Sequence, residues 1–333
     1  MRLGCLSKYR TELMGISALM ILVCHAPGNG IVMPKYLEYA MVQGQIGVDI
    51  FLFLSGMGLW YSLSKISFWG GSWYLNRYIK ILVPYIIIQG TLTAIRCIMD
   101  DSLGILFWLS NISTTEFWLT HRAAWFIALL LPLYLIAPLL FRFLKTNATV
   151  KTIGLLVLTY IIALFPLKMI GQENDYCNVF YNIQFVMIRV PSFILGMYMA
   201  PYIKANAIIK SAWIIPMLIG AMAMFVLTKK PIDTYMFLVL PVMFFWITLF
   251  RIKEDGIFNS ICRFFGGISL ESYLWNGLGV AIIPLMALLR IPDHNNLVMY
   301  SLVLIIGTIL SVTVSRISQP IIKFLTRNLS HQK

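Results

Sequence analysis

The sequence predicts an all-α polytopic membrane protein with about ten transmembrane helices and both termini in the cytoplasm. Three observations predict this fold class. Charged residues make up 12% of the 333-residue chain and hydrophobic residues 59%, whereas a soluble domain carries about 25% charged residues. The apolar residues gather in segments of spanning length. The basic residues gather in alternate loops.

Ten apolar segments are each about as long as the ~20-residue helix that crosses the hydrocarbon of a bilayer. In chain order they cover residues 12–33, 44–63, 78–99, 123–143, 150–168, 179–202, 211–228, 232–250, 266–289 and 297–316. The first resembles a signal peptide, but apolar character resumes after Pro27, which predicts a retained helix with a break near that proline.

The loops between these segments predict the orientation. Every second loop, beginning with the N-terminal segment, holds most of the lysines and arginines of the chain. The other loops hold only Lys35, Arg122, Lys168, Lys229, Lys230 and Arg290. The positive-inside rule therefore predicts that both ends face the cytoplasm. We expect a multi-pass protein of the inner (plasma) membrane.

Composition and motifs exclude several function classes. The net charge of +13 comes without a basic run interleaved with exposed aromatics, so no nucleic-acid partner is expected. The five cysteines and four histidines have neither CxxC nor metal-ligand spacing, so neither a disulfide framework nor a metal site is expected. Gly-rich phosphate loops and GxSxG or HExxH motifs are also missing from the sequence.

Polar side chains inside the predicted spans therefore carry the functional information. A charged group costs about 2.5–3.5 kcal/mol at the centre of a spanning helix, so such groups should face protein rather than lipid. The candidates are His25, Asp49, Arg96, Gln184, Arg189, Glu271 and Asn276.

His25 ends the apolar run of the first span. From Leu13 it lies twelve residues, or about 18 Å, along a helix, which predicts a ring beyond mid-bilayer. Asp49 enters the second span from the opposite side, and a hydrogen bond from His25 to its carboxylate would fix the imidazole tautomer and raise its basicity. A satisfied core histidine and a helix-capping Asp49 are the structural alternatives.

Arg77 and Lys80 lie one helical turn apart at the predicted cytoplasmic end of the third span. Two cations on one face could clamp a phosphorylated ligand. The alternative is an ordinary membrane anchor that reaches lipid phosphate.

Six pieces of sequence, taken together and in order, resemble the membrane acyltransferase 3 family. They are the basic N-terminal segment that leads to His25, GVDIFLFLSGMGL (47–59), NRYIKILVPY (76–85), WFIALLLPLYLIAPLL (125–140), RVPSFILGMYM (189–199) and ISLESYLWNG (268–277). The resemblance covers nearly the whole chain and implies a single transmembrane acyltransferase domain over residues 1–333. It also implies transfer of an acetyl group from cytoplasmic acetyl-CoA to a carbohydrate hydroxyl, and no metal is expected to take part.

The resemblance also implies residue roles. His25 matches the catalytic histidine of the family and Asp49 the acid of its GVD segment, while Arg77 and Lys80 match its donor-associated RxxR pair. The remaining matches are Arg189, which opens the RxP segment, and Glu271 and Tyr273 in the SLE-Y segment. Three positions depart from the family pattern, namely Met14 in place of an arginine that Arg10 could replace, Asn276 in place of a histidine, and Gln319 in place of an acid.

The chemistry of acyl transfer can be stated without the family. It needs a base near the hydroxyl proton, a donor to the developing oxyanion and a cationic dock for the nucleotide of CoA. His25 suits the first need, and Arg77 with Lys80 the last. Arg189 suits the oxyanion, or pairs structurally with Glu271. Direct deprotonation of the acceptor and an acyl-histidine relay both stay open.

The partners expected are acyl-CoA, a carbohydrate acceptor and membrane lipid, and a homodimer is left open. Trp125 belongs to a set of aromatics that could stack on a sugar, although an aromatic belt at the membrane interface is the ordinary explanation. A transporter or flippase of a polar or lipid-linked sugar is the main alternative function, and a glycan polymerase or glycosyltransferase is another.

Overall fold

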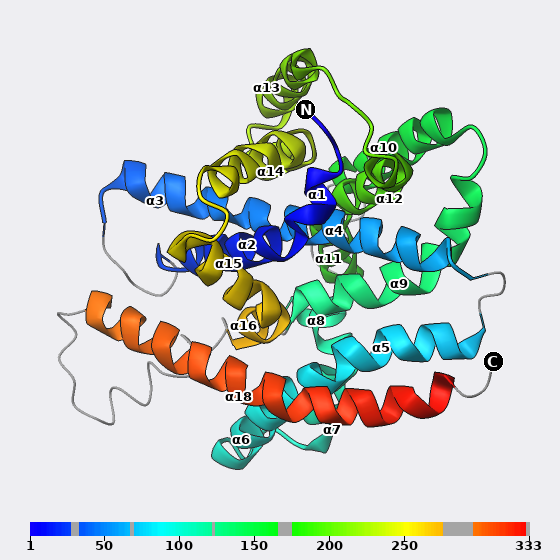
Figure 1. Ribbon diagram of the computed structural model, residues 1–333. Coiled ribbons are helices and arrows are strands. Elements are labelled where there is room, and N and C mark those ends of the chain that lie inside the picture. Colours follow the sequence, from blue (N-terminus) through cyan, green and yellow to red (C-terminus); the bar gives the residue numbers. More distant parts are fainter. Residues whose placement is uncertain (28–32, 67–69, 122–123, 166–174, 276–295, 331–333) are drawn as a thin grey trace. The chain divides into compact units, whose positions relative to one another are not determined.

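The computed structural model describes residues 1–27, 33–66, 70–121, 124–165, 175–275 and 296–330. Within these ranges the chain is helical, and its only β-structure is a bridge between Arg2 and Ile208. The all-α fold class is therefore confirmed (Figure 1).

The described helices follow the apolar segments of the sequence. They are α1 (Cys5–Lys8), α2 (Arg10–Cys24), α3 (Lys35–Val42), η2 (Gln43–Gln45), α4 (Ile46–Leu63), α5 (Gly71–Tyr85), the π-helix η3 (Ile86–Gly90), α6 (Thr91–Met99), α7 (Ile105–Ile112), α8 (Thr115–Thr120), α9 (Trp125–Phe143), α10 (Ala148–Leu164), α11 (Asp175–Met187), α12 (Val190–Lys204), η5 (Ser211–Trp213), α13 (Ile214–Thr228), η6 (Pro231–Thr234), α14 (Tyr235–Ile252), α15 (Ile257–Gly267), α16 (Ser269–Trp275) and α18 (Asn296–Ser330).

Seven helical stretches in the described ranges are long and apolar enough to cross a membrane. They are Lys35–Leu63, Gly71–Met99, Trp125–Phe143, Val179–Lys204, Ser211–Thr228, Pro231–Ile252 and Tyr300–Arg327. The shorter apolar helix α10 overlaps the predicted span 150–168, and α2 overlaps only the first part of the predicted span 12–33. The predicted span 266–289 falls largely outside the described residues, so the total of ten and the cytoplasmic termini stay predictions.

The chain divides into two compact units. The first unit comprises Met1–Phe51 with Tyr202–Arg316, and the second comprises Leu52–Pro201 with Ile317–Lys333. Each unit combines segments that are far apart in the sequence, so neither could be recognised from a composition shift along the chain.

Glycines set the closest helix crossing of the first unit. Helices α2 and α15 lie side by side (Figure 1). A Cβ atom on Gly15 would lie 1.7 Å from the carbonyl oxygen of Cys262, and a Cβ atom on Gly266 would lie 2.1 Å from that of Thr11. The two backbones therefore touch where each helix has a glycine, as is common between membrane helices.

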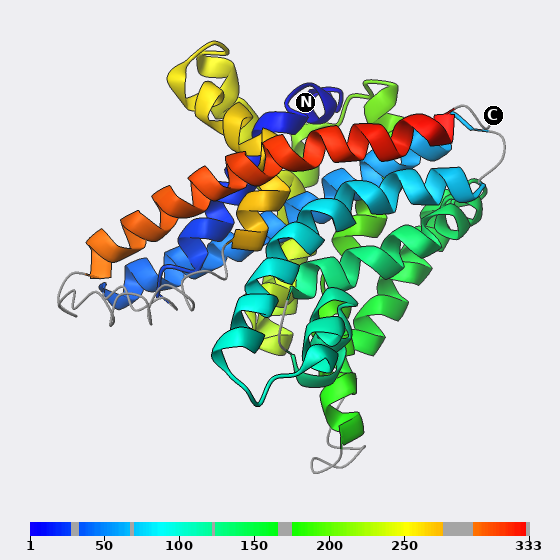
Figure 2. The same cartoon turned by 90° about the horizontal axis from the view of Figure 1, so that it is seen from below.

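Glycines also set a close helix crossing in the second unit. A Cβ atom on Gly56 of α4 would lie 2.2 Å from the carbonyl oxygen of Phe193, and one on Gly196 of α12 would lie 2.1 Å from that of Phe53. Glycine at these positions is thus required by close approach of the backbones. Elsewhere in this unit, α5 packs beside α9 (Figure 2).

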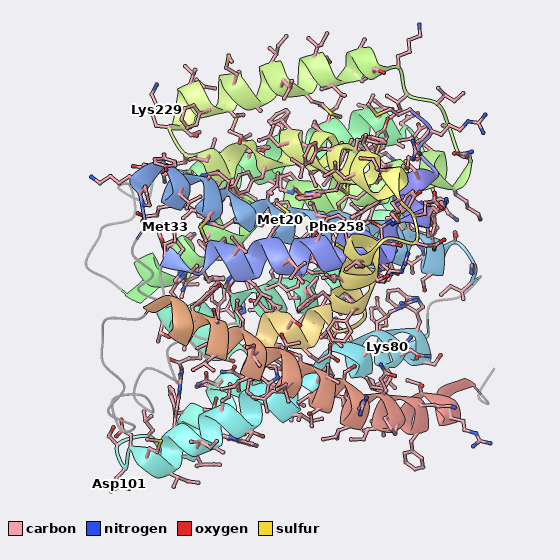
Figure 3. All side chains as sticks on the ribbon, turned by 60° about the vertical axis from the view of Figure 1, so that its left-hand side comes forward. Met20, Met33, Lys80, Asp101, Lys229 and Phe258 are labelled. Carbon is pink, nitrogen blue, oxygen red and sulfur yellow. The ribbon has the colours of Figure 1, made fainter. Side chains whose placement is uncertain are left out.

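Helix α13 presents an apolar surface on the outside of the first unit, to which it belongs. Its side chains project outward along most of its length, up to Lys229 at its end (Figure 3). Ile215, Ile219, Met222 and Val226 are all exposed. A spanning helix with such a surface is suited to contact lipid hydrocarbon.

Candidate functional site

His25 is the residue at which α2 ends in the first unit. Helix α2 stops at Cys24, before the predicted break near Pro27, and the backbone N–H of Ala26 closes the final turn by donating to Val23. The His25 side chain is exposed. The ring is thus accessible to another molecule, at the end of a helix whose other face is packed.

Two glycines define how α2 runs beside the start of the next span. A Cβ atom on Gly44 would lie 2.3 Å from the carbonyl oxygen of Met20, and one on Gly47 would lie 2.6 Å from that of Ser17. As the residue number rises from Gly44 to Gly47, the contacted residue on α2 falls from Met20 to Ser17. The two segments are therefore antiparallel, as predicted.

The same register bears on Asp49, which is 1% exposed in the first turn of α4. Continuing the antiparallel course by two residues from Gly47, which is level with Ser17, brings Asp49 level with about Gly15. That level is ten residues, or about 15 Å along the helix axis, from His25. The direct hydrogen bond between His25 and Asp49 that the sequence suggested stays a prediction.

Helix α18 holds the end of α2 and the predicted acid of α16. The hydroxyl of Tyr300 donates to the carbonyl oxygen of Leu22, three residues before His25. Glu271 is buried and hydrogen-bonded to Ser315. Tyr273 is half-buried, and Asn276 lies outside the described residues. The Tyr300 contact was not predicted, because a tyrosine in a spanning segment has no distinctive spacing.

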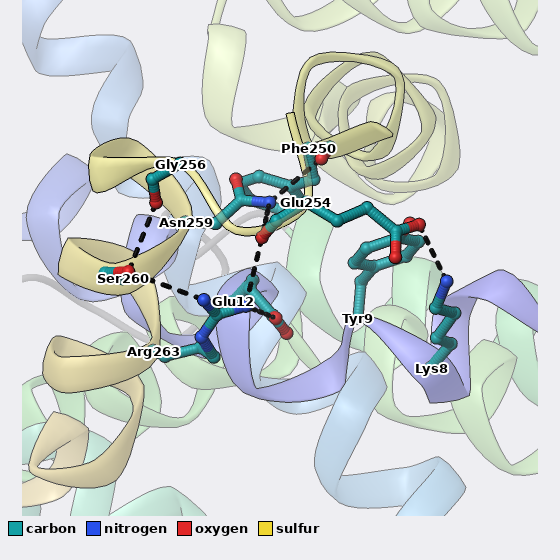
Figure 4. A network of polar contacts seen from close by, with 9 residues as sticks. All are labelled: Lys8, Tyr9, Glu12, Phe250, Glu254, Gly256, Asn259, Ser260 and Arg263. Carbon is teal, nitrogen blue, oxygen red and sulfur yellow. Dashed lines mark hydrogen bonds and ion pairs between the residues drawn. The ribbon is translucent and has the colours of Figure 1, made fainter. Parts of the chain in front are cut away.

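A polar network anchors the other end of α2 (Figure 4). Glu12 is 7% exposed and pairs with Arg263 of α15, with 3.2 Å between Oε1 and Nη1. The carboxylate of Glu254 accepts hydrogen bonds from Lys8, at 2.7 Å, and from the Tyr9 hydroxyl. Glu12 was not among the predicted site residues, although an acid in the first turn of a helix is a recognisable signal. Arg10, the first residue of α2, is exposed.

The acidic centre of this network responds to pH in a definite direction. Hydrogen bonds from Lys8 and Tyr9 lower the pKa of Glu254 below its usual value. A lowered pKa means that the carboxylate is more readily ionised in the folded protein, so the contact is present at neutral pH. It weakens only as the pH falls through the lowered pKa.

We expect Glu12→Gln to destabilise the first unit by about 1 kcal/mol, because it weakens a partly exposed ion pair to a neutral hydrogen bond. Thermal unfolding in detergent measures the effect. Glu38→Gln is the matched control, since Glu38 is also an acid in the first turn of a helix but is exposed. Equal effects of the two changes would contradict a role for the Glu12 pair.

In the second unit, Arg77 and Lys80 share one face of α5. At about 100° per residue they fall within about 60° of each other and of Trp73. The guanidinium carbon of Arg77 lies 5.9 Å from the Trp73 ring centroid, a cation–π geometry. Arg77 is half-buried, and Lys80 is exposed (Figure 3).

Tyrosines on a neighbouring face of α5 fix this arrangement. Tyr74 and Tyr78 donate to the carbonyl oxygens of Leu135 and Leu131 on α9, at 3.3 and 2.8 Å. These anchors leave the face with the two cations turned about 110° away from α9. The orientation of the predicted phosphate clamp is thus set by packing on its neighbouring face.

Arg189 is 1% exposed and has the largest fully buried side chain of the described residues. It lies where the chain leaves α11 and before α12 begins. Because Arg189 belongs to the second unit and Glu271 to the first, the expected pair between them stays a prediction. Two other polar candidates are less buried: Gln184 donates to the backbone of Phe165, and Arg96 is exposed near the end of α6.

Trp125 belongs to an aromatic cluster in the second unit. Its ring centroid is 5.2 Å from that of Phe185, which also contacts the ring of His121 at 4.6 Å. Nδ1 of His121 lies 2.6 Å from the side-chain oxygen of Asn182, whose amide donates to the backbone of Phe117. These contacts favour a packing role for Trp125 and His121 over an aromatic-belt role.

A hollow of about 560 Å³ lies in the first unit beside α2. Apolar side chains line most of it, including those of Met20, Leu238 and Trp246. Its polar element is the hydrogen bond from Tyr235 to Gln43, at 2.9 Å. A surface of this kind suits hydrocarbon, whereas a sugar site requires several convergent polar groups.

A family model described as an acyltransferase domain matches residues 13–316 of the chain. The matched range includes parts of both units and all the predicted site residues except Arg10. Comparisons with curated proteins and with solved structures give no match.

Proposed function

Because the chain belongs to the acyltransferase 3 family and is a membrane O-acyltransferase, we propose that it moves an acetyl or other short acyl group from cytoplasmic acyl-CoA to a carbohydrate hydroxyl. The acceptor is a glycan of the cell surface or one destined for export. The observation that carries the proposal is the placement of His25, an exposed imidazole at the end of a helix held by α15 and α18.

His25 acts in the proposed reaction as the proton acceptor. A neutral imidazole takes the proton of the sugar hydroxyl as the oxygen attacks the thioester carbonyl, and the thiolate of CoA leaves. In the alternative route, His25 attacks the thioester first and then passes the acyl group to the sugar. Ping-pong kinetics distinguish the second route from the first.

The remaining site residues have proposed roles of binding and stabilisation. Arg189, a buried cation, suits the oxyanion that forms at the thioester carbonyl. Glu271, Tyr273, Asn276 and Trp125 are proposed contacts for the acceptor. Asp49 is proposed as the acid that orients the site, and Arg10 as a further contact of the donor.

Arg77 and Lys80 are proposed to hold the phosphates of acyl-CoA. Replacing both by glutamine should raise the KM for acyl-CoA by about tenfold or more, because one charge-assisted contact of about 1.4 kcal/mol is worth a factor of ten. Initial rates at varied acyl-CoA concentration measure this. Lys65→Gln is the control, since Lys65 is exposed and lies in the same predicted cytoplasmic loop. An unchanged KM in the double variant would contradict the assignment.

Mass spectrometry of the cell's glycans with and without the gene tests the function. We expect deletion to remove one acyl mass from a glycan repeat, and that mass difference identifies both the acyl group and the acceptor. A glycan whose acylation is unchanged but whose export stops would instead favour a transporter.

A further inference from the structure

A small cavity lies in the first unit between α16, α18 and the last turn of α2. Its volume is about 20 Å³, and about 10–15 Å³ suffices for one water molecule. Most of the cavity wall is formed by one face of α18, whose lining residues recur every three or four positions from Tyr300 to Ser311. Helices α16 and α18 lie side by side in both views (Figures 1 and 2).

The α16 side of the cavity presents two buried polar atoms. Ser272 and Trp275, one helical turn apart, are 4% and 9% exposed and line the cavity. Among the described residues, neither the Ser272 hydroxyl nor the Trp275 indole N–H has a hydrogen-bond partner. Buried donors of this kind are almost always satisfied, and the indole N–H can only donate.

The α18 side presents acceptors. The hydroxyl of Tyr300 donates to Leu22, that of Thr308 to the carbonyl of its preceding turn at 2.7 Å, and that of Ser311 likewise at 2.6 Å. Each hydroxyl therefore donates its proton to a backbone carbonyl, and its oxygen can still accept a hydrogen bond. Donors on one wall of the cavity thus face acceptors on the other.

We propose that this cavity binds one ordered water molecule. The water accepts a hydrogen bond from Trp275 Nε1, bonds to Ser272 Oγ and donates to hydroxyl oxygens of α18. A water with two to four polar partners is the usual occupant of a polar cavity of this size. The site joins α16 to α18 and, through Tyr300, to Leu22 on the last turn of α2.

Gly307→Ala tests the proposal by filling the cavity. Gly307 lines it, and a Cβ atom there would meet only the Cβ atom of Trp275, at 3.9 Å, an ordinary contact. We expect the added methyl group to displace the water and leave the Trp275 indole N–H without a hydrogen bond. Ultraviolet resonance Raman spectra of the full chain in nanodiscs report the N–H bond, and subtracting the spectrum of Trp275→Phe isolates this residue.

Gly154→Ala is the matched control, because a Cβ atom on this α10 glycine meets nothing within 4 Å. The Trp275 band should move to the position of a non-bonded indole in Gly307→Ala and stay unchanged in the control. The same band in both variants overturns the proposal. An experimental density map of the parent protein gives a second test: a water peak between Ser272 and Trp275 supports the site, and a map that resolves other buried waters but not this one refutes it.

Discussion

Replacing His25 by alanine should lower the rate of acyl transfer by about 100- to 10,000-fold, the usual contribution of a general base. His25 is the exposed residue directly after the last residue of α2, so truncating its side chain should leave the helix intact. We expect His25→Gln to be as inactive as His25→Ala, because an amide keeps the polar shape but cannot take a proton at neutral pH.

Initial-rate measurements on purified protein in nanodiscs give the comparison. Val23→Ala, an exposed position near the same helix end, should retain the parental rate. Normal size-exclusion behaviour of all variants would exclude unfolding as the cause. Parental activity of His25→Gln would contradict the assignment of His25 as the base or acyl carrier.

Replacing Gly15 by alanine should produce the largest loss of stability, about 3 kcal/mol or more. The new Cβ atom would lie 1.7 Å from the backbone oxygen of Cys262, and no rotamer change can move a backbone atom. Helices α2 and α15 must therefore separate, which costs packing along the whole crossing. We expect a markedly lower midpoint of thermal unfolding, together with lost activity, because α2 carries His25.

The control is Gly154→Ala, the same chemical change in a helix with open space around the site. It should be neutral or slightly stabilising, because alanine has the higher helix propensity. If the Gly15→Ala and Gly154→Ala variants unfold at the same temperature, the close backbone contact between α2 and α15 at Gly15 is contradicted.

The helical fold was predictable because apolar length is a local property of the sequence. Spans such as 211–228 and 232–250 coincide closely with helical stretches of the structure. The first span was less well predicted: α2 covers Arg10–Cys24 rather than 12–33. The polar residues Arg10 and Thr11 come before the apolar run, so hydropathy placed the start of this helix two residues too late.

The site was predictable in its residue types and less so in its geometry. Antiparallel neighbours were expected, but the register that brings Asp49 level with Gly15 depends on backbone contacts at Gly44 and Gly47. Nothing in the spacing of these glycines shows which helix they touch. The division into two units likewise depends on contacts between distant segments.

Transfer of a labelled acyl group by the purified chain tests the central claim most directly. Acetyl-CoA carrying ¹³C in the acetyl group is incubated with the chain in nanodiscs and with glycan from a strain that lacks the gene. The account predicts a ¹³C-acetyl ester on the glycan with the parent protein and none with His25→Ala. Unlabelled glycan with the folded parent protein, or equal labelling by His25→Ala, would contradict it.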